Sequence, residues 1–139
     1  MILLDTNIIS ALMQPVPNPN VIQWLNQQKQ SQLYLPSIVV AEIRYGLQRM
    51  PQGQRQSALV SQFSSLLHTI FSGRILPFAQ NEAEAYAIIR AAREAQGKPI
   101  SVCDAQIAAI AQVHQALLAT RNTKDFESCG IVLINPFES

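Results

Sequence analysis

The first seven residues, MILLDTN, place a short apolar run at residues 2–4 directly before an aspartate, Asp5. A run of this length is typical of a buried strand. Four more runs of strand length follow, at residues 33–35, 75–77, 117–120 and 131–134. Helical patterns fill the chain between them. Because parallel strands need long crossover connections, the alternation predicts an α/β fold, a three-layer sandwich in which helices flank a central, mostly parallel sheet of about five strands.

Prolines, glycines and capping residues divide the helical stretches. Pro51-Gln52-Gly53 separates two expected helices, and Asn81 with Glu84 resembles a capping box. Gly97 has the position of a C-terminal cap. The expected helices are a first one that starts with Ile8 and ends before Pro15, a second one around residues 21–25, and longer ones at 37–49, 55–71, 81–97 and 102–115.

The composition is that of a globular chain with its own core. With 139 residues, of which 48% are apolar and 14% charged, we expect residues 1–139 to form a single domain. No apolar run approaches the roughly 20 residues that span a bilayer. The N-terminus lacks a basic segment followed by a long apolar stretch, so we expect a cytoplasmic protein. Two cysteines, Cys103 and Cys129, are too few for a disulfide scaffold and are expected to be small buried residues.

A net charge of +1 argues against a protein that coats nucleic acid through bulk electrostatics. Local cationic patches remain compatible with this charge. The cations that could contact phosphates if the fold gathers them are Arg44, Arg49, Arg90, Arg93, Arg121 and Lys124.

The chain has only three aspartates, Asp5, Asp104 and Asp125, and their placement predicts a shared site. Asp5 ends the first strand, and open parallel sheets bind ligands beyond the carboxyl ends of their strands. Asp125 lies shortly after the run that ends at Thr120, so it can reach the same edge of the sheet.

Two further carboxylates, Asp104 and Glu42, lie on helix faces that are expected to point inward. Asp104 is in the first turn of its helix. The stripe of Asp104 includes Ile107, Ala108 and Ala111, and that of Glu42 includes Ile38, Val39 and Tyr45.

Carboxylates that converge on one place repel one another, and burying one costs on the order of several kcal/mol unless it is paired, protonated or bound to a metal. A hard divalent cation such as Mg²⁺ or Mn²⁺ resolves this conflict, because it prefers oxygen ligands. Such an ion supports phosphodiester hydrolysis without a histidine, cysteine or serine nucleophile, through one ion or two.

Each acidic residue also has an ordinary interpretation. Asp5 could be a turn residue, Asp104 a helix cap and Asp125 a surface aspartate. Glu42 could form an ion pair with Arg44 or another arginine. The joint interpretation is favoured because all four acids are expected at one edge of one sheet.

Four blocks of the sequence resemble PIN-domain proteins of the VapC toxin type. They are LLDTN at residues 3–7, VAEIRYG at 40–46, DAQIAA at 104–109 and TRNTKDF at 120–126. The blocks come in the order and spacing of that family, and together they span nearly the whole chain. The resemblance implies a PIN-like fold and a Mg²⁺- or Mn²⁺-dependent endoribonuclease that cuts RNA. Such a protein is usually the toxin of a bacterial type II toxin–antitoxin pair, a homodimer that a small antitoxin protein inhibits.

By position, Asp5, Glu42 and Asp104 match the acidic triad of the family. The fourth acidic place is either Asp125, as in a subgroup whose block ends in Asp-Phe, or the place of Asn122, where some relatives carry aspartate and where Asn122 could orient a water. Supporting or substrate-positioning roles are expected for Thr6, Asn7, Thr120, Asn122 and Arg44. The chain departs from the family at Ser101-Val102-Cys103, and the Cys103 side chain is expected to point away from the site.

Three other functions stay open at this stage. The first is an RNA-processing nuclease without an antitoxin. The second is a haloacid dehalogenase-type phosphatase with an aspartyl nucleophile, although Asn7 stands where that class has a second aspartate. The third is a catalytically silent PIN-like binding module. His68 and His114 are expected to be structural or surface residues, and Trp24 and Phe63 are expected in the core.

Overall fold

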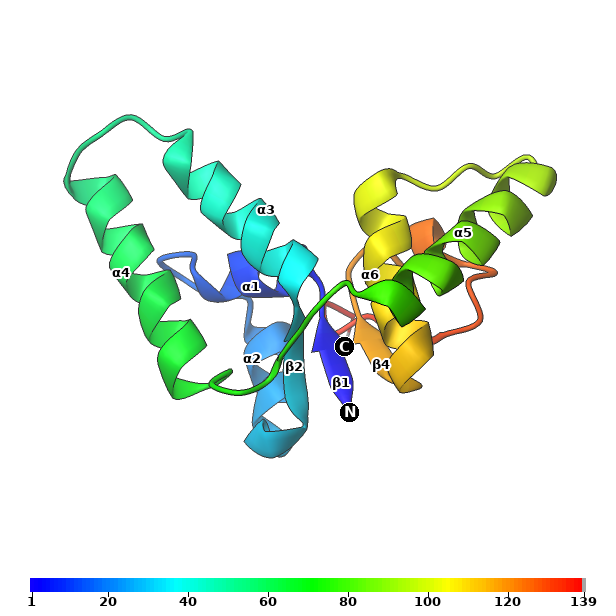
Figure 1. Ribbon diagram of the computed structural model, residues 1–139. Coiled ribbons are helices and arrows are strands. Elements are labelled where there is room, and N and C mark those ends of the chain that lie inside the picture. Colours follow the sequence, from blue (N-terminus) through cyan, green and yellow to red (C-terminus); the bar gives the residue numbers. More distant parts are fainter. Residues whose placement is uncertain (139) are drawn as a thin grey trace.

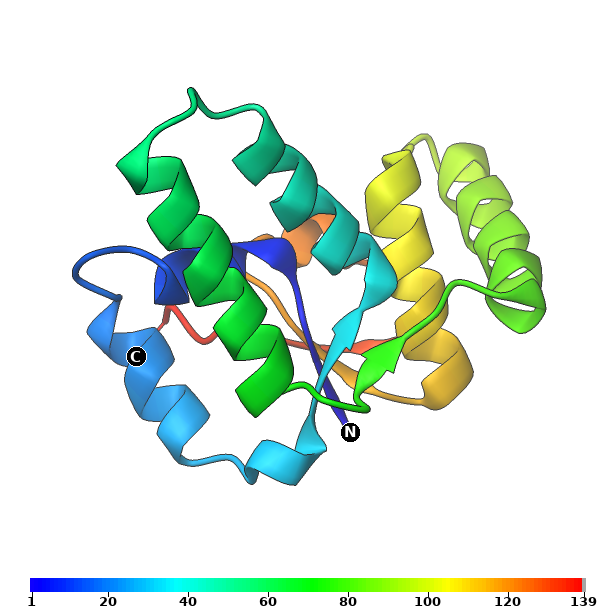
Figure 2. The same cartoon turned by 60° about the vertical axis from the view of Figure 1, so that its left-hand side comes forward.

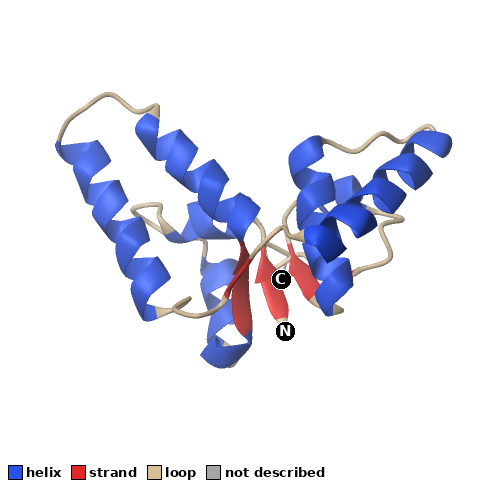
Figure 3. Cartoon of the chain, in the orientation of Figure 1, coloured by secondary structure: helices blue, strands red, loops and turns tan. Residues whose placement is uncertain are grey.

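The computed structural model describes residues 1–138 and contains one five-stranded sheet with the strand order β3-β2-β1-β4-β5. Every recorded strand pair is parallel. The strands are β1 (Ile2–Leu4), β2 (Leu33–Pro36), β3 (Ile75–Leu76), β4 (Leu117–Ala119) and β5 (Val132–Ile134). Figure 3 shows them between the helices, as the sandwich prediction requires. The predicted fold class is therefore confirmed.

Six α-helices connect and cover the strands. They are α1 (Thr6–Leu12), α2 (Pro19–Asn26), α3 (Ser37–Gln48), α4 (Gln54–Thr69), α5 (Gln80–Ala95) and α6 (Val102–His114), with short 3₁₀ helices η1 (Gln30–Gln32) and η2 (Thr123–Phe126). The pairs α3–α4 and α5–α6 lie on opposite sides of the sheet (Figure 1), and the view in Figure 2 shows α2 beside α4 on the same side as α3.

The strand order places a topological switch at β1. From β1 the chain continues outward to β2 and β3, and it then crosses back to β4 on the other side of β1. In open parallel sheets, a ligand crevice forms beyond the carboxyl ends of the strands at such a point. The residues that follow β1 and β4 are therefore the first to consider for a site.

The core lies between the sheet and the two helix layers. Leu3 and Leu4 of β1 and Leu118 of β4 are fully buried. The four alanines and two isoleucines of α6 are buried, and the small alanine side chains allow α5 to pack closely against this helix. Phe63 is fully buried as expected, and Trp24 is partly buried against the core.

Two helix starts differ from the sequence-based expectation. Helix α1 begins at Thr6, two residues before Ile8, because the Asp5 carboxylate caps it. The capping box at Asn81 is wrong, because α5 begins at Gln80 after Ala79, a residue without a side-chain cap. The C-terminal cap is confirmed, since Gly97 follows α5 with a φ of +71°, a conformation that glycine adopts without strain.

Within residues 1–138, no helix is long and apolar enough to cross a membrane. That residues 1–139 form a single domain stays a prediction, which limited proteolysis would test.

Candidate active site

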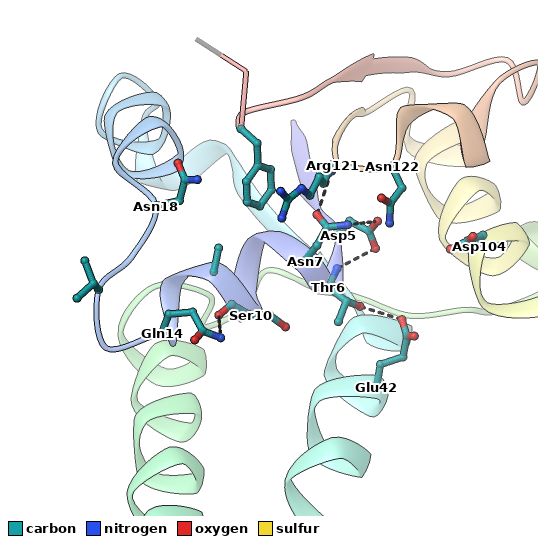
Figure 4. A pocket seen from close by; sticks show the side chains of 13 residues that line it. Asp5, Thr6, Asn7, Ser10, Gln14, Asn18, Glu42, Asp104, Arg121 and Asn122 are labelled. Carbon is teal, nitrogen blue, oxygen red and sulfur yellow. Dashed lines mark hydrogen bonds between the residues drawn. The ribbon is translucent and has the colours of Figure 1, made fainter.

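A pocket of about 680 Å³ opens beside the carboxyl ends of β1 and β4 (Figure 4). We call it the carboxylate pocket, because three acidic side chains from three elements line it. Its walls include Asp5, Asn7, Glu42, Asp104, Arg121 and Asn122. Three of the four acids predicted from the sequence thus meet in one place.

Asp5 is the most buried acid of the pocket, with 5% of its surface exposed. Its backbone N–H donates to the Ala119 carbonyl at 3.0 Å, which extends the pairing of β1 with β4 by one residue. One carboxylate oxygen, Oδ1, accepts from the Thr6 N–H at 2.8 Å and caps α1. The other, Oδ2, accepts from the Thr120 hydroxyl at 2.7 Å and from Asn7 Nδ2 at 3.3 Å. Asp5 is therefore held in one orientation by three donors.

Thr120 and Asn7 link the end of β4 to the end of β1. Thr120 is fully buried, and its hydroxyl oxygen accepts from the Asn122 N–H at 3.1 Å. Asn7 Oδ1 accepts from the Arg121 N–H at 3.0 Å. Thr120 and Asn7, for which we expected supporting roles, thus fix the segment after β4 relative to the Asp5 carboxylate.

Glu42 lies on α3 at the margin of its apolar face. The Thr6 hydroxyl donates to Glu42 Oε1 at 2.8 Å, which directs the carboxylate towards the end of β1. The expected inward stripe was wrong at Tyr45, whose side chain is 64% exposed. The buried stripe of α3 consists of Val39, Ile43 and Leu47, so Glu42 is half-buried and faces the pocket.

Arg44 does not pair with Glu42. Among residues 1–138 the single ion pair joins Arg90 to Glu94. The Arg44 guanidinium lies over the Phe63 ring at 4.8 Å and donates to Ser64 of α4. Arg44 is absent from the pocket wall, so no contact in the structure supports the role that we expected for it.

Asp104 lies in the first turn of α6, as predicted, and its expected stripe is fully buried at Ile107, Ala108 and Ala111. The cap of α6 is Ser101, whose hydroxyl oxygen accepts from the Asp104 N–H at 3.1 Å. The Asp104 side chain is therefore not needed as the cap and faces the pocket (Figure 4).

The two aspartates of the pocket resist ionisation. Burial, and after it the negative charge of Asp5, raises the pKa of Asp104 from 3.8 to about 6. Burial also raises the pKa of Asp5, although the donors Thr120, Thr6 and Asn7 oppose this rise. Raised pKa values of this kind are typical of carboxylates at functional sites, where they bind a cation or exchange a proton.

Asp125 lies in η2 and is exposed, and its side chain is not part of the pocket wall, whereas Asn122 is. The charge of Asp125 nevertheless reaches the pocket, because it raises the pKa of both Asp5 and Asp104. The structure therefore brings Asn122 to the wall and places Asp125 outside it.

The η2 segment is held by a buried arginine, Arg93 of α5. Its guanidinium donates to the carbonyls of Asp125 at 2.9 Å and Glu127 at 3.0 Å, and its Nε donates to the Lys98 carbonyl at 2.7 Å. Only 5% of Arg93 is exposed. The prediction from the sequence that Arg93 is a cation available to contact phosphate is therefore wrong.

The remaining titratable candidates lie outside the pocket wall. His68 is exposed and His114 half-buried. Cys129 is buried as expected. Cys103 is half-buried and is not part of the pocket wall, and burial, followed by the nearby charges of Glu42 and Asp104, raises the pKa of its thiol.

The donor set of the pocket suits a hard cation. Among the described residues, no group of three or more His, Cys, Asp or Glu side chains is arranged to hold a metal ion by itself. The acids instead line separate walls, with Asp5 bound by Thr120 and Glu42 by Thr6. Mg²⁺ is commonly bound by one or two carboxylates and several waters, so oxygen donors on separate walls fit a largely hydrated ion.

Comparison with known proteins identifies the family. A model of the PIN domain matches residues 2–130. The chain belongs to the PIN-domain family. A VapC ribonuclease from Sinorhizobium fredii is 40% identical over 138 residues and covers 99% of both chains, and toxin FitB from Neisseria gonorrhoeae is 39% identical over 137 residues with the same coverage. The crystal structure of FitAcB from N. gonorrhoeae matches this PIN domain with a TM-score of 0.94 and 38% identity over 100% of both chains.

The predicted resemblance to VapC-type PIN proteins is thereby confirmed. Membership in this family leaves no support for the phosphatase with an aspartyl nucleophile. The sequence analysis did not predict the remaining residues of the pocket wall, which are Ser10, Ala11, Gln14, Val16, Asn18 and Phe137. These residues carry no chemistry that marks them in the sequence, and only the fold brings them to the pocket.

Proposed function

We propose that this PIN-domain chain is a Mg²⁺- or Mn²⁺-dependent endoribonuclease and the toxin of a type II toxin–antitoxin pair. The observation that carries the proposal is the meeting of Asp5, Glu42 and Asp104 in one pocket, with the pKa of Asp104 raised to about 6 by burial and by the Asp5 charge. Relatives that match 99% of the chain are named VapC ribonuclease and toxin FitB, which supports both RNA cleavage and the role of a toxin.

The three pocket acids would hold a hydrated metal ion between them, directly or through bound waters, and we propose Asp125 as a fourth, more distant acid that acts through its charge. A bound Mg²⁺ or Mn²⁺ supplies a Lewis acid that neutralises charge on the phosphodiester and activates the attacking water. Thr120 and Asn7 orient the Asp5 carboxylate, and Thr6 orients that of Glu42. Asn122 lies on the wall beside them and can orient a water or a phosphate oxygen.

We also propose that the chain forms a homodimer and that a small antitoxin protein inhibits it. A solved structure of FitAB bound to a DNA fragment resembles this chain along its whole length, and a VapBC complex from Rickettsia felis resembles it at 26% identity. Copurification with the product of the neighbouring gene would test the antitoxin, and sedimentation of the free chain would test the dimer.

The central test is RNA cleavage by the purified, inhibitor-free protein with Mg²⁺ or Mn²⁺ and with EDTA. We expect cleavage only with metal, and we expect Asp5→Asn and Asp104→Asn to abolish it while the proteins stay folded. Glu84→Gln is the matched control, because Glu84 is an exposed acid of α5 outside the pocket wall and should leave cleavage unchanged. Cleavage that persists in both aspartate variants would contradict the mechanism. RNA that is bound but never cut would instead favour the silent binding module.

A further inference from the structure

We infer that Arg121, stacked on Phe137, binds a phosphate group of a single-stranded RNA at the carboxylate pocket. The inference rests on the proposed function for its substrate class, and it adds a binding subsite to that pocket. Arg121 follows β4 directly after Thr120, and Phe137 belongs to the C-terminal turn, so two distant parts of the chain build this subsite.

Three contacts fix Arg121 before any substrate arrives. Its backbone N–H donates to Asn7 Oδ1 at 3.0 Å, and its carbonyl accepts from Asn135 Nδ2 at 3.4 Å. Its guanidinium carbon lies 4.7 Å from the centre of the Phe137 ring. Figure 4 shows Arg121 beside Asp5 and Asn7 at the pocket. The two hydrogen bonds fix the backbone of Arg121, and the stacking on Phe137 places its guanidinium, which reduces the side-chain freedom lost when it binds an anion.

Phe137 is itself anchored on α2 and within its own turn. The Phe137 carbonyl accepts from Asn20 Nδ2 at 2.9 Å, and its N–H donates to Asn135 Oδ1 at 2.9 Å. Asn135 therefore bonds both members of the stacked pair. These bonds fix the Phe137 backbone, and its half-buried side chain packs against the core, so the ring is a stable platform for the guanidinium.

The negative charge of the pocket favours a cation beside it. Among the described side chains that line the carboxylate pocket, three are acidic and Arg121 is the only cation. A phosphodiester that approaches three carboxylates is repelled, and a nearby guanidinium offsets part of this repulsion.

The donors of the Arg121 guanidinium are also available. Within residues 1–138 the guanidinium donates no hydrogen bond to protein, whereas those of Arg74 and Arg93 are committed to backbone carbonyls. Stacking on a ring occupies the face of a guanidinium and leaves its N–H edge free for a planar, two-point contact with phosphate.

The chain offers a matched control for this pair. Arg49 lies over the Tyr45 ring at 5.4 Å, so it forms a similar stacked pair, and neither residue lines the carboxylate pocket. A general effect of surface charge would appear equally in Arg49 and Arg121 variants. A specific subsite would appear only in the Arg121 variants.

The test measures binding of a fluorescein-labelled single-stranded RNA pool of random sequence at several salt concentrations. All proteins carry Asp5→Asn, so that binding is read without cleavage. Loss of one phosphate contact to a single strand should reduce the slope of log affinity against log salt by about 0.7. We expect this reduction, and an affinity about tenfold lower, for Arg121→Gln. Arg49→Gln should match the parent protein.

Two further variants separate charge from geometry. Arg121→Lys keeps the charge but loses the planar two-point contact, so the salt slope should stay while affinity falls. Phe137→Leu removes the platform and should also weaken binding with an unchanged slope, because Arg121 remains. In the cleavage-competent protein, Arg121→Gln should raise KM more than it lowers kcat.

Equal slopes for Arg121→Gln and its parent, equal losses in the Arg49 and Arg121 variants, or no RNA binding by the Asp5→Asn protein would overturn the inference. These results are distinct from failure of the proposed function. If the protein binds RNA through Arg121 but never cuts it, the proposed nuclease activity is refuted and the proposed binding subsite is still supported.

Discussion

Replacement of Asp104 by asparagine should stabilise the metal-free protein. Burial, followed by the charge of Asp5, raises the pKa of Asp104 from 3.8 to about 6, so the ionised carboxylate destabilises the folded state at neutral pH. A rise of this size would correspond to about 3 kcal/mol of unfolding free energy if the group were fully shielded. Asp104 is only half-buried, and solvent screening reduces the expected gain to about 1 kcal/mol.

The sign of the effect follows from proton binding. Since the folded-state pKa is the higher one, the folded protein binds more protons than the unfolded chain between pH 3.8 and about 6. The free energy of unfolding of the wild type should therefore fall as the pH rises through this window. In Asp104→Asn this fall should be smaller, so the advantage of the variant is absent below pH 3.8 and complete above about pH 6.

The assay is urea and thermal unfolding in EDTA below, within and above this pH window. A gain of about 1 kcal/mol should raise the melting temperature by about 3–5 °C for a chain of this size. Glu84→Gln, an exposed acid outside the pocket, should show no such pH dependence. Added Mg²⁺ should stabilise the wild type more than Asp104→Asn, because a ligand stabilises the state that binds it. A variant that is less stable than the wild type above pH 6, or a difference independent of pH, would refute the reasoning.

Two further predictions concern the supports of the pocket, and a third concerns two glycines in loops. Thr120→Val removes the buried hydroxyl that donates to Asp5 at 2.7 Å, so it should lower the free energy of unfolding by about 2 kcal/mol in urea titrations and reduce cleavage. Arg93→Met leaves three backbone carbonyls without their donor and should cost about 3 kcal/mol, with faster amide exchange in η2; unchanged exchange there would contradict the role of this arginine. Gly130→Ala and Gly97→Ala should each lower stability by about 1 kcal/mol in thermal melts, because both glycines have a φ near +70° and the new Cβ at Gly130, 2.9 Å from Gln112 Nε2, meets only the flexible end of a side chain; a much larger loss at Gly130 would contradict this reasoning.

Much of the fold could be predicted because local patterns determine it. The apolar runs at the five strands are short and bounded, and the break at residues 51–53 separates α3 from α4. The start of α5 could not be predicted from its capping pattern, because the helix begins one residue before Asn81. A cap of this kind depends on how the preceding loop approaches the helix, and tertiary contacts determine that approach.

Asp5, Glu42 and Asp104 could be found because each combines an acidic side chain with a position at a strand end or on an inward helix face. Other features of the site depend on contacts between distant segments. Arg93 looked like an exposed cation, but its buried role requires the carbonyls of η2, more than thirty residues later in the chain. Phe137 reaches the pocket from the other end of the chain, where Asn20 of α2 donates to its carbonyl. No local pattern predicts such pairings.

The most direct test of the account is the position of a metal ion in crystals grown with MnCl₂, located by anomalous scattering. The account predicts a peak in the carboxylate pocket within coordination distance of Asp5 and Asp104, directly or through water, and the loss of that peak in Asp104→Asn crystals. A peak at any other place, or an empty pocket at saturating Mn²⁺, would contradict the claim that these carboxylates form a metal site.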